Sequence, residues 1–484
     1  MPPVLLWLRN DLRLHDHEAW HMALATGAPV LPVYCVDPGQ FALDATLGVP
    51  RSGPFRAQFL LEALHDLRES CRARGGELLI RMGSPAHELP RLAQAVQAAG
   101  VVLHEEPATD ERAEVRAVRD ALARDGRWCR TVAGHSLVPE DALPFAEGSV
   151  PGTFTAFRRL VEREVTIPEA RPAPRALPAV VLPPDCAPGA VPSLTDLGLD
   201  APPQDSRAQW RCTGGERAGL DRLDAWMWRA DRLRRYKQTR NGLLDPDDAS
   251  RLSPWLALGC LSVRHVHDEV RRYEAARVRS DDTNWLVVEL LWRDFFRFSA
   301  RAAGTRLFAA GGIQRHRMRW RTLDAPDAQH DFERWATGTT GFPLVDAAMR
   351  ELAATGFTTN RARQNAASFL SRVLGLDWRL GAAWFEAWLV DYDVSSNWGN
   401  WQYVAGVGHD ARGFRFFNVH KQALDYDPDA RYLRHWLPEL AALSAADAHR
   451  PERSGRAVGY PAPMCDLTEA ARATERRYLA GGGN

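Results

Sequence analysis

The chain has 484 residues, of which 45% are hydrophobic, and its 61 basic and 61 acidic residues give a formal net charge of +0. This length predicts two or three domains, and the hydrophobic content excludes a disordered protein. With balanced charge, any nucleic-acid site must be a local basic patch. The seven cysteines form no CxxC or Cys/His cluster, so we expect no metal site and a reducing compartment. No secretory signal or membrane-spanning run is apparent, which predicts a cytoplasmic protein.

Short apolar runs alternate with helical patterns over the first part of the chain. Strands are predicted at residues 4–8, 30–36, 78–82 and 101–104, with helical patterns at 55–72 and 86–99 between them. This alternation predicts an α/β domain over residues 1–135, with a doubly wound, Rossmann-like parallel sheet. No GxGxxG motif follows the first strand, so a standard dinucleotide site is not predicted.

The middle of the chain changes composition. Ten prolines fall between residues 167 and 204, a density that excludes a regular helix or a central strand. We therefore predict a Pro-rich interdomain linker over residues 136–212. From residue 213 to 440 no alternating strand pattern is present, which predicts an all-α domain. Residues 441–484 are predicted to be a short C-terminal tail.

Polar residues interrupt the helical apolar pattern between residues 340 and 418. A packed core does not need so many polar groups among aromatic residues, whereas a large, flat ligand with polar edges does. The positions concerned lie on shared helical faces or beside a turn: Asn360, Arg363, Gln364, Asp391, Asp393, Asn397 and Trp401.

Two further segments have the residue types of a binding site. In the SRLSP segment, Ser253 is a good N-cap and Pro254 suits the first helical position, so the free N–H groups there suit a pyrophosphate; a plain helix start is the simpler interpretation of this segment alone. In the WLVVELLWRDFFR segment, Glu289, Trp292 and Arg293 share one helical face, where a buried Glu–Arg pair is the structural alternative to a binding role. The basic segment 226–241 fits either a solvated helix face or a DNA-facing surface.

The order of the motifs resembles the photolyase/cryptochrome family, and the details resemble its DASH branch. The similar motifs are WLRNDLRLHD, YKQTRNG, SRLS, TNRARQNAASFL, DWRLG and DYDVSSNWGNWQY. The resemblance implies a helical FAD-binding catalytic domain and light-driven electron transfer from reduced FAD to cyclobutane pyrimidine dimers, mainly in single-stranded or locally opened DNA. The alternative is a blue-light photoreceptor with a signalling role and little or no repair. We expect a monomer with no membrane partner.

The resemblance also implies roles for individual residues. The FAD contacts are Tyr236, Ser250, Arg251, Leu252, Ser253, Arg293, Asn360, Arg363, Asp391, Asp393 and Asn397, with Arg363 paired to Asp391. The residues implied to line the lesion pocket are Glu289, Trp292 and Asn360. The implied electron-transfer chain is Trp401, Trp378 and Trp320. The implied DNA contacts are Arg361, Gln364 and Tyr403.

Three of these positions refine the expected substrate. Six-four enzymes of the family carry a histidine pair where this chain has Asn360 and Gln364, so the cyclobutane dimer is the expected lesion. Asn397 is a neutral amide that tolerates a fully reduced flavin, which favours repair over signalling alone. Tyr403 stands where dimer photolyases more often carry Trp, and a smaller aromatic wall argues against efficient repair in duplex DNA.

In this family the α/β domain often carries an antenna pigment, which in the DASH branch is usually methenyltetrahydrofolate. Glu111 occupies a matching acidic position. It is also an ordinary acidic residue for a helix N-terminus, where the helix dipole favours it. The sequence does not favour one interpretation over the other.

Overall fold

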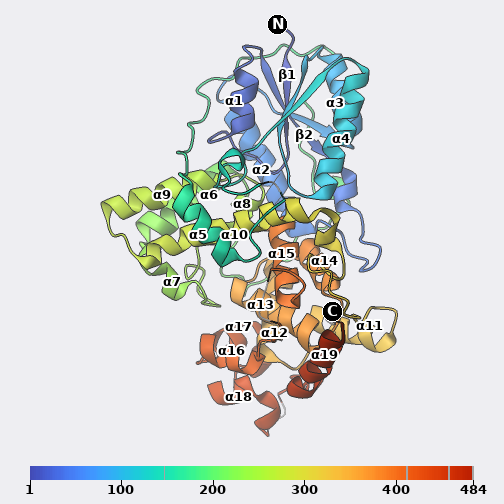
Figure 1. Cartoon of the computed structure of the whole chain (residues 1–484), viewed down its shortest axis with the longest axis vertical. Coiled ribbons are helices and arrows are strands. Elements are labelled where there is room, and N and C mark those ends of the chain that lie inside the picture. Colours follow the sequence, from blue (N-terminus) through green and yellow to red (C-terminus); the bar gives the residue numbers. More distant parts are fainter. Residues whose placement is uncertain (147, 410–412, 456–457, 482–484) are drawn as a thin grey trace.

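The computed structural model describes residues 1–146, 148–409, 413–455 and 458–481 (Figure 1). Its sheet has the order β3-β2-β1-β4-β5 with parallel pairing throughout. The strands are β1 (Val4–Leu8), β2 (Val30–Val36), β3 (Leu79–Met82), β4 (Gly100–His104) and β5 (Trp128–Val132). The first four match the predicted positions to within one residue. The fifth was missed because it is a half-exposed edge strand without a continuous apolar run.

Helices cover both faces of the sheet, as predicted for a doubly wound domain. Alternate side chains of β1 point to opposite faces. Leu5 and Trp7 pack with α3 (Pro85–Ala95) and α4 (Thr109–Arg124). Leu6 and its neighbours face α1 (Glu18–Leu24), α2 (Pro54–Arg72) and, in the same apolar cluster, the helical domain. One apolar cluster therefore spans both domains, while other clusters lie within each domain alone.

The predicted linker differs from expectation at one point. Residues 167–204 are irregular except for a short 3-10 turn, Thr195–Leu197, and they lie along the sheet edge, where the Ile80 amide donates to the Pro188 carbonyl at 2.8 Å. However, the proline-free segment before them forms helix α5 (Phe154–Glu164), capped by Thr153. Its buried side chains, Phe154, Phe157 and Val161, form an amphipathic stripe, so residues 136–212 are not a linker throughout.

The second domain is helical, and no strand occurs among its described residues. Figure 1 shows α10 between the sheet and the C-terminal helices. The α-helices from residue 213 to 440 are α6 (Glu216–Asp224), α7 (Tyr236–Thr239), α8 (Ser253–Ala257), α9 (Val263–Ala276), α10 (Asp281–Ala303), α11 (Pro326–Ala336), α12 (Pro343–Thr355), α13 (Asn360–Ser368), α14 (Trp378–Trp388), α15 (Val394–Ala405), α16 (Val419–Tyr426) and α17 (Arg431–Trp436). None of the described helices has the length and apolar content needed to cross a membrane.

The segment after residue 440 was predicted to be a tail, and the structure corrects this. It forms α18 (Ala445–His449) and α19 (Leu467–Gly481). Leu467, Ala471 and Tyr478 form a buried stripe on α19, and the Tyr478 hydroxyl donates to the Gly406 carbonyl at 2.9 Å. The segment thus completes the helical core; residues 456–457 and 482–484 of it lie outside the described residues.

Candidate active site

A cavity of about 420 Å³ brings together residues from distant parts of the helical domain. The predicted site residues that line it are Tyr236, Ser250, Arg251, Leu252, Ser253, Glu289, Trp292, Arg293, Asn360, Arg361, Arg363, Gln364, Asp391, Asp393 and Tyr403. A smaller pocket of about 100 Å³ shares Asp391 with it and is lined by Asn397 and Trp401. Trp378 and Trp320 are not among the residues that line either of these pockets, and Glu111 lines a separate cavity.

The predicted Arg363–Asp391 pair is present. The Arg363 guanidinium donates to Asp391 Oδ2 at 2.9 Å and, through Nε, to the Thr358 carbonyl at 2.8 Å. Asp391 is 8% exposed, and its other carboxylate oxygen has no protein partner. A buried acceptor of this kind is costly unless a ligand satisfies it, so Asp391 fits the polar edge of a bound cofactor.

Asp393 is held by a second arginine that the sequence analysis did not identify. Its carboxylate accepts from the Ser396 amide at 2.7 Å as the N-cap of α15, and Arg297 approaches it to 3.7 Å. Burial alone would raise the pKa of Asp393, but the charges of Arg297 and Arg293 outweigh it and lower that pKa. Arg297 also donates to Glu106 of the α/β domain at 3.2 Å. The arginine that pairs with Asp393 is therefore held by a residue of the other domain.

The SRLS segment lies at the cavity, but its helix start differs from the prediction. Leu252 is the N-cap and Ser253 is the first residue of α8, so the predicted Ser253 cap is wrong by one position. Arg251 adopts a left-handed conformation with φ 52°, and Leu252 is already helical with φ −79°. The Arg251 guanidinium is buried between the rings of Trp210 and Phe357, at 5.1 and 5.0 Å from their centroids.

Glu289 and Arg293 do not form the buried pair that was the alternative to a binding role. Glu289 accepts from Arg240 at 2.8 Å and from the Trp285 indole at 3.1 Å, whereas Arg293 donates to the His135 carbonyl at 2.6 Å. Enclosure raises the pKa of Glu289, although the charge of Arg240 opposes the rise. Arg240 was missed; its place in the YKQTRNG motif was the available signal.

Trp292 forms a flat aromatic surface, which is packed against a residue of the segment predicted to be a linker. Phe154 of α5 stacks on it with ring centroids 3.7 Å apart and an interplanar angle of 13°. Tyr403 meets its edge at 6.1 Å. The sequence analysis did not identify Phe154 as a site residue, because an aromatic residue before a Pro-rich segment carries no distinguishing signal.

Trp401 and Asn397 face the smaller pocket from α15 and are held against α14. A β-carbon placed on Gly381 would lie 2.1 Å from the Trp401 ring, so this close packing requires glycine there. The Asn397 amide donates to the Ala382 carbonyl at 3.0 Å, which fixes the orientation of that side chain. Trp401 is 2% exposed.

The other two tryptophans of the predicted chain converge on one acceptor. The indole N–H groups of Trp378 and Trp320 each donate to the Ala310 carbonyl at 3.0 Å. Trp378 is fully buried and begins α14, the helix against which Trp401 packs, whereas Trp320 is partly buried. Of the three predicted chain members, Trp401 therefore lies at the pocket wall, Trp378 in the core and Trp320 nearer the protein surface.

A second cavity, of about 530 Å³, lies at the carboxyl ends of the sheet strands and is also lined by α14 and α15. Glu111 lines it from the first turn of α4, so its position agrees with both interpretations made from the sequence. One of its carboxylate oxygens has no protein partner, and burial raises the pKa of Glu111 to about 7. Such a carboxyl group suits a ligand that accepts or shares a proton.

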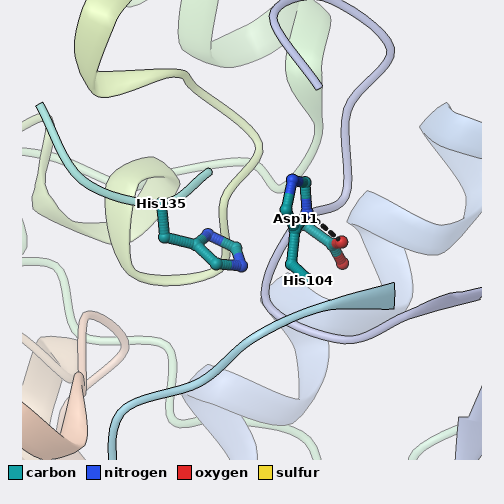
Figure 2. A group of neighbouring side chains, drawn as sticks. All are labelled: Asp11, His104 and His135. Carbon is teal, nitrogen blue, oxygen red and sulfur yellow. Dashed lines mark hydrogen bonds and ion pairs between the residues drawn. The ribbon is translucent and has the colours of Figure 1, made fainter. Parts of the chain in front are cut away.

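A buried Asp–His cluster, which the sequence analysis missed, lies between the two domains (Figure 2). Asp11, His104 and His135 place ligand-type atoms within 4.8 Å of one another. Yet Asp11 Oδ2 already pairs with His104 Nδ1 at 2.8 Å and His17 Nε2 at 3.1 Å, and these hydrogen bonds hold the pKa of Asp11 well below its usual range despite burial. Because the His135 carbonyl accepts from Arg293, the cluster also supports the active site.

Comparison with known proteins agrees with this geometry. The family model described as DNA photolyase matches residues 4–178, and the FAD binding domain of DNA photolyase matches residues 285–480. A cryptochrome DASH from Gloeobacter violaceus is 50% identical over 99% of this chain and 96% of its own length. A solved structure of the Synechocystis sp. PCC6803 cryptochrome superposes with a TM-score of 0.92 at 43% identity, covering 98% of this chain and 99% of that one. The structure of a bacterial class III photolyase from Agrobacterium tumefaciens superposes with a TM-score of 0.84 at 30% identity, covering 99% of this chain and 98% of that one.

The fold and the cavity therefore define a flavoprotein with a photolyase-type FAD-binding domain. The chain belongs to the photolyase/cryptochrome family and is of the cryptochrome-DASH type.

Proposed function

We propose that this protein repairs cyclobutane pyrimidine dimers in blue light, mainly in single-stranded or locally opened DNA, by electron transfer from reduced FAD. One observation carries the proposal: a single cavity contains both the proposed FAD contacts, such as Asp391, and the proposed lesion contacts, Glu289 and Trp292. A photoreceptor would need the former but not the latter.

Each group of residues has a distinct task in this proposal. FAD, when bound, supplies the electron that splits the dimer. Arg363 and Asp391 hold its ring system, Ser250 and Ser253 hold its phosphates, and Asn397 meets the flavin edge. The enclosed carboxyl group of Glu289 hydrogen-bonds to a base edge of the dimer, where it stabilises negative charge.

The preference for unpaired DNA rests on the aromatic and basic residues of the cavity. Trp292, backed by Phe154, offers a flat surface for a flipped-out dimer, whereas Tyr403 offers a smaller wall than tryptophan. Arg361 lies over the Tyr426 ring at 4.4 Å, which presents a positive charge at the cavity despite zero net charge. Binding should therefore weaken strongly as salt rises.

The test is a repair assay with chemically reduced FAD in blue light, using matched single-stranded and duplex DNA that each contain one dimer. We expect faster repair of the single strand. Equal repair of both would remove the single-strand preference and leave photolyase activity standing. Repair of neither, with FAD bound, would favour the alternative of a signalling photoreceptor.

Three further parts of the proposal have separate tests. Methenyltetrahydrofolate is the proposed antenna in the second cavity, near Glu111, and its absorption in the purified protein would identify it. We propose a cytoplasmic location, consistent with the absence of disulfides among the seven cysteines, which cell fractionation tests. A monomer is the proposed state, tested by light scattering on the holoprotein.

A further inference from the structure

The second cavity and the tryptophan chain are connected through Trp398. This residue of α15 meets Trp378 edge to face, with ring centroids 5.7 Å apart and an interplanar angle of 79°. Its indole N–H donates to the Tyr392 hydroxyl at 3.2 Å. The Tyr392 hydroxyl in turn donates to Glu386 Oε2 at 2.9 Å. A continuous path of contacts therefore leads from Trp378 to a carboxylate in the wall of the second cavity.

The charges around Tyr392 restrict how it can be oxidised. The Arg56 guanidinium lies over its ring, 4.6 Å from the centroid, and Arg51 pairs with Glu386 at 3.3 Å. A cation over the ring opposes any positive charge that forms there. The phenol can lose an electron without that penalty only if its proton leaves at the same time. Glu386 is hydrogen-bonded to that proton.

We propose that Tyr392 is the terminal electron donor of a side branch of the tryptophan chain and that Glu386 accepts its proton. The inference rests on the proposed photoreduction through Trp401 and Trp378. Trp401 gives one electron to light-excited FAD, Trp378 refills Trp401, and Trp398 refills Trp378. Tyr392 then gives one electron to the oxidised indole of Trp398 while its O–H bond breaks and the proton moves to Glu386 Oε2. One electron has then reached the cofactor, and a neutral tyrosyl radical remains beside a protonated carboxyl group.

The geometry distinguishes this branch from the path to Trp320. Trp378 contacts both routes, since it shares the Ala310 carbonyl with Trp320 and an aromatic contact with Trp398. Only the Trp398 branch ends at a phenol with a carboxylate partner. An oxidised indole there can be neutralised by proton-coupled transfer, so the charge-separated state should last longer than with tryptophans alone.

The test is electron paramagnetic resonance on the FAD-loaded, oxidised protein, frozen during blue illumination without an external donor. We expect a neutral tyrosyl signal in the wild type and its loss in Tyr392→Phe and in Trp398→Phe. Glu386→Gln keeps a hydrogen-bond acceptor but not a base, so the signal should fall at least several-fold. Its decay in the wild type should slow in D2O, because a proton must return.

Tyr432→Phe is the matched control, because the Tyr432 hydroxyl also donates to a buried glutamate, Glu351, at 2.8 Å. It should leave the signal unchanged. A tyrosyl signal that persists in Tyr392→Phe, or a wild type that forms only tryptophan radicals, would overturn the inference while leaving the proposed photoreduction intact. Failure of the proposed photoreduction would look different, because flavin absorbance would then not change on illumination at all. If Tyr392→Phe does not bind FAD, the size of the tyrosyl signal in Glu386→Gln and the decay rate of the wild-type signal in D2O still test the inference.

Discussion

The two cavities of about 420 and 530 Å³ differ in how their candidate ligand-binding carboxyl groups are partnered. In the proposed FAD cavity the three carboxylates of the predicted site have arginine partners: Arg363 for Asp391, Arg297 for Asp393 and Arg240 for Glu289. The second cavity also contains paired carboxylates, such as Glu114 with Arg9 and Glu386 with Arg51, but Glu111 forms no ion pair among the described residues, and burial raises the pKa of Glu111 to about 7.

This difference bears on how specific each cavity is. Carboxylates that are already paired with arginines are oriented before a ligand arrives, so they select a ligand that matches fixed positions. A buried carboxyl group near its pKa can change protonation to suit what binds. We therefore expect the first cavity to accept one cofactor and the second to be sensitive to pH and to tolerate different ligands.

The largest expected effect is on electron transfer in the first cavity. Trp401→Phe should abolish photoreduction of oxidised FAD, or slow it at least about 100-fold, because phenylalanine is a much poorer electron donor. The ring change keeps most of the apolar volume, so folding and FAD binding should survive. Flavin absorbance per mole of bound FAD, followed in light with a thiol donor, measures this.

Repair that starts from chemically reduced FAD should remain normal in Trp401→Phe, which serves as the internal control. Normal photoreduction in this variant would contradict the role of Trp401 and of the path through Trp378 and Trp320. Joint loss of stability and FAD would instead identify a structural tryptophan.

The next effect tests the paired acids. Asp391→Ala should weaken FAD binding by about 2–4 kcal/mol, or roughly 30- to 1,000-fold, because Arg363 loses its partner and the ligand loses an acceptor. Fluorescence titration of the apoprotein with FAD gives the Kd. Asp425→Ala, which breaks the exposed pair with Lys421, is the control and should leave the Kd unchanged. Equal affinity of Asp391→Ala and wild type would mean that the pair is structural only.

Gly381→Ala tests the packing of Trp401 against α14 beside the same cavity. Gly381→Ala would place a methyl group 2.1 Å from the Trp401 ring, so the two helices must separate or the indole must turn. We expect a loss of about 1–3 kcal/mol in the free energy of unfolding, measured in denaturant. Gly152→Ala, which meets nothing within 4 Å, is the matched control. A fully stable Gly381→Ala with unchanged tryptophan fluorescence would argue against this packing.

The smallest expected effect separates the two cavities by pH. The pKa of Glu111 is about 7 in the folded chain against an ordinary value of 4.5, so the folded state binds the extra proton between these limits. Stability contributed by this group is present below pH 4.5 and is lost as pH rises towards 7. Glu111→Gln should remove that loss. The free energy of unfolding of the variant should therefore exceed that of the wild type by about 1–2 kcal/mol at pH 8 and equal it at pH 4.

Denaturant unfolding at several pH values measures this difference. Glu475→Gln on α19 is the control and should reproduce the wild-type pH dependence. An unchanged slope in Glu111→Gln would mean that Glu111 is an ordinary charged residue at a helix N-terminus, and the contrast between the two cavities would fail.

The sequence alone determined the elements whose buried faces are indicated by the local spacing of apolar residues. The strands β1, β2 and β4 were predicted because both faces are buried, so their apolar runs are continuous. The edge strand β3 was predicted from its apolar residues, although only the first two of its residues are buried. The all-helical character of residues 213–440 was predicted from the absence of an alternating strand pattern. Motif order added the predicted site residues, and those assigned to FAD, the lesion and DNA line the first cavity or the pocket that adjoins it.

Only the tertiary structure decided which side chains meet. Arg240 pairs with Glu289 across 49 positions and Arg297 with Glu106 across 191, separations at which local periodicity carries no information. The edge strand β5, helix α5 and helix α19 were missed or misjudged for a related reason: short or half-exposed elements become stable only through what they pack against. The contact of Trp398 with Trp378 and Tyr392, which joins the second cavity to the predicted tryptophan chain, likewise exists only because α14 and α15 pack side by side.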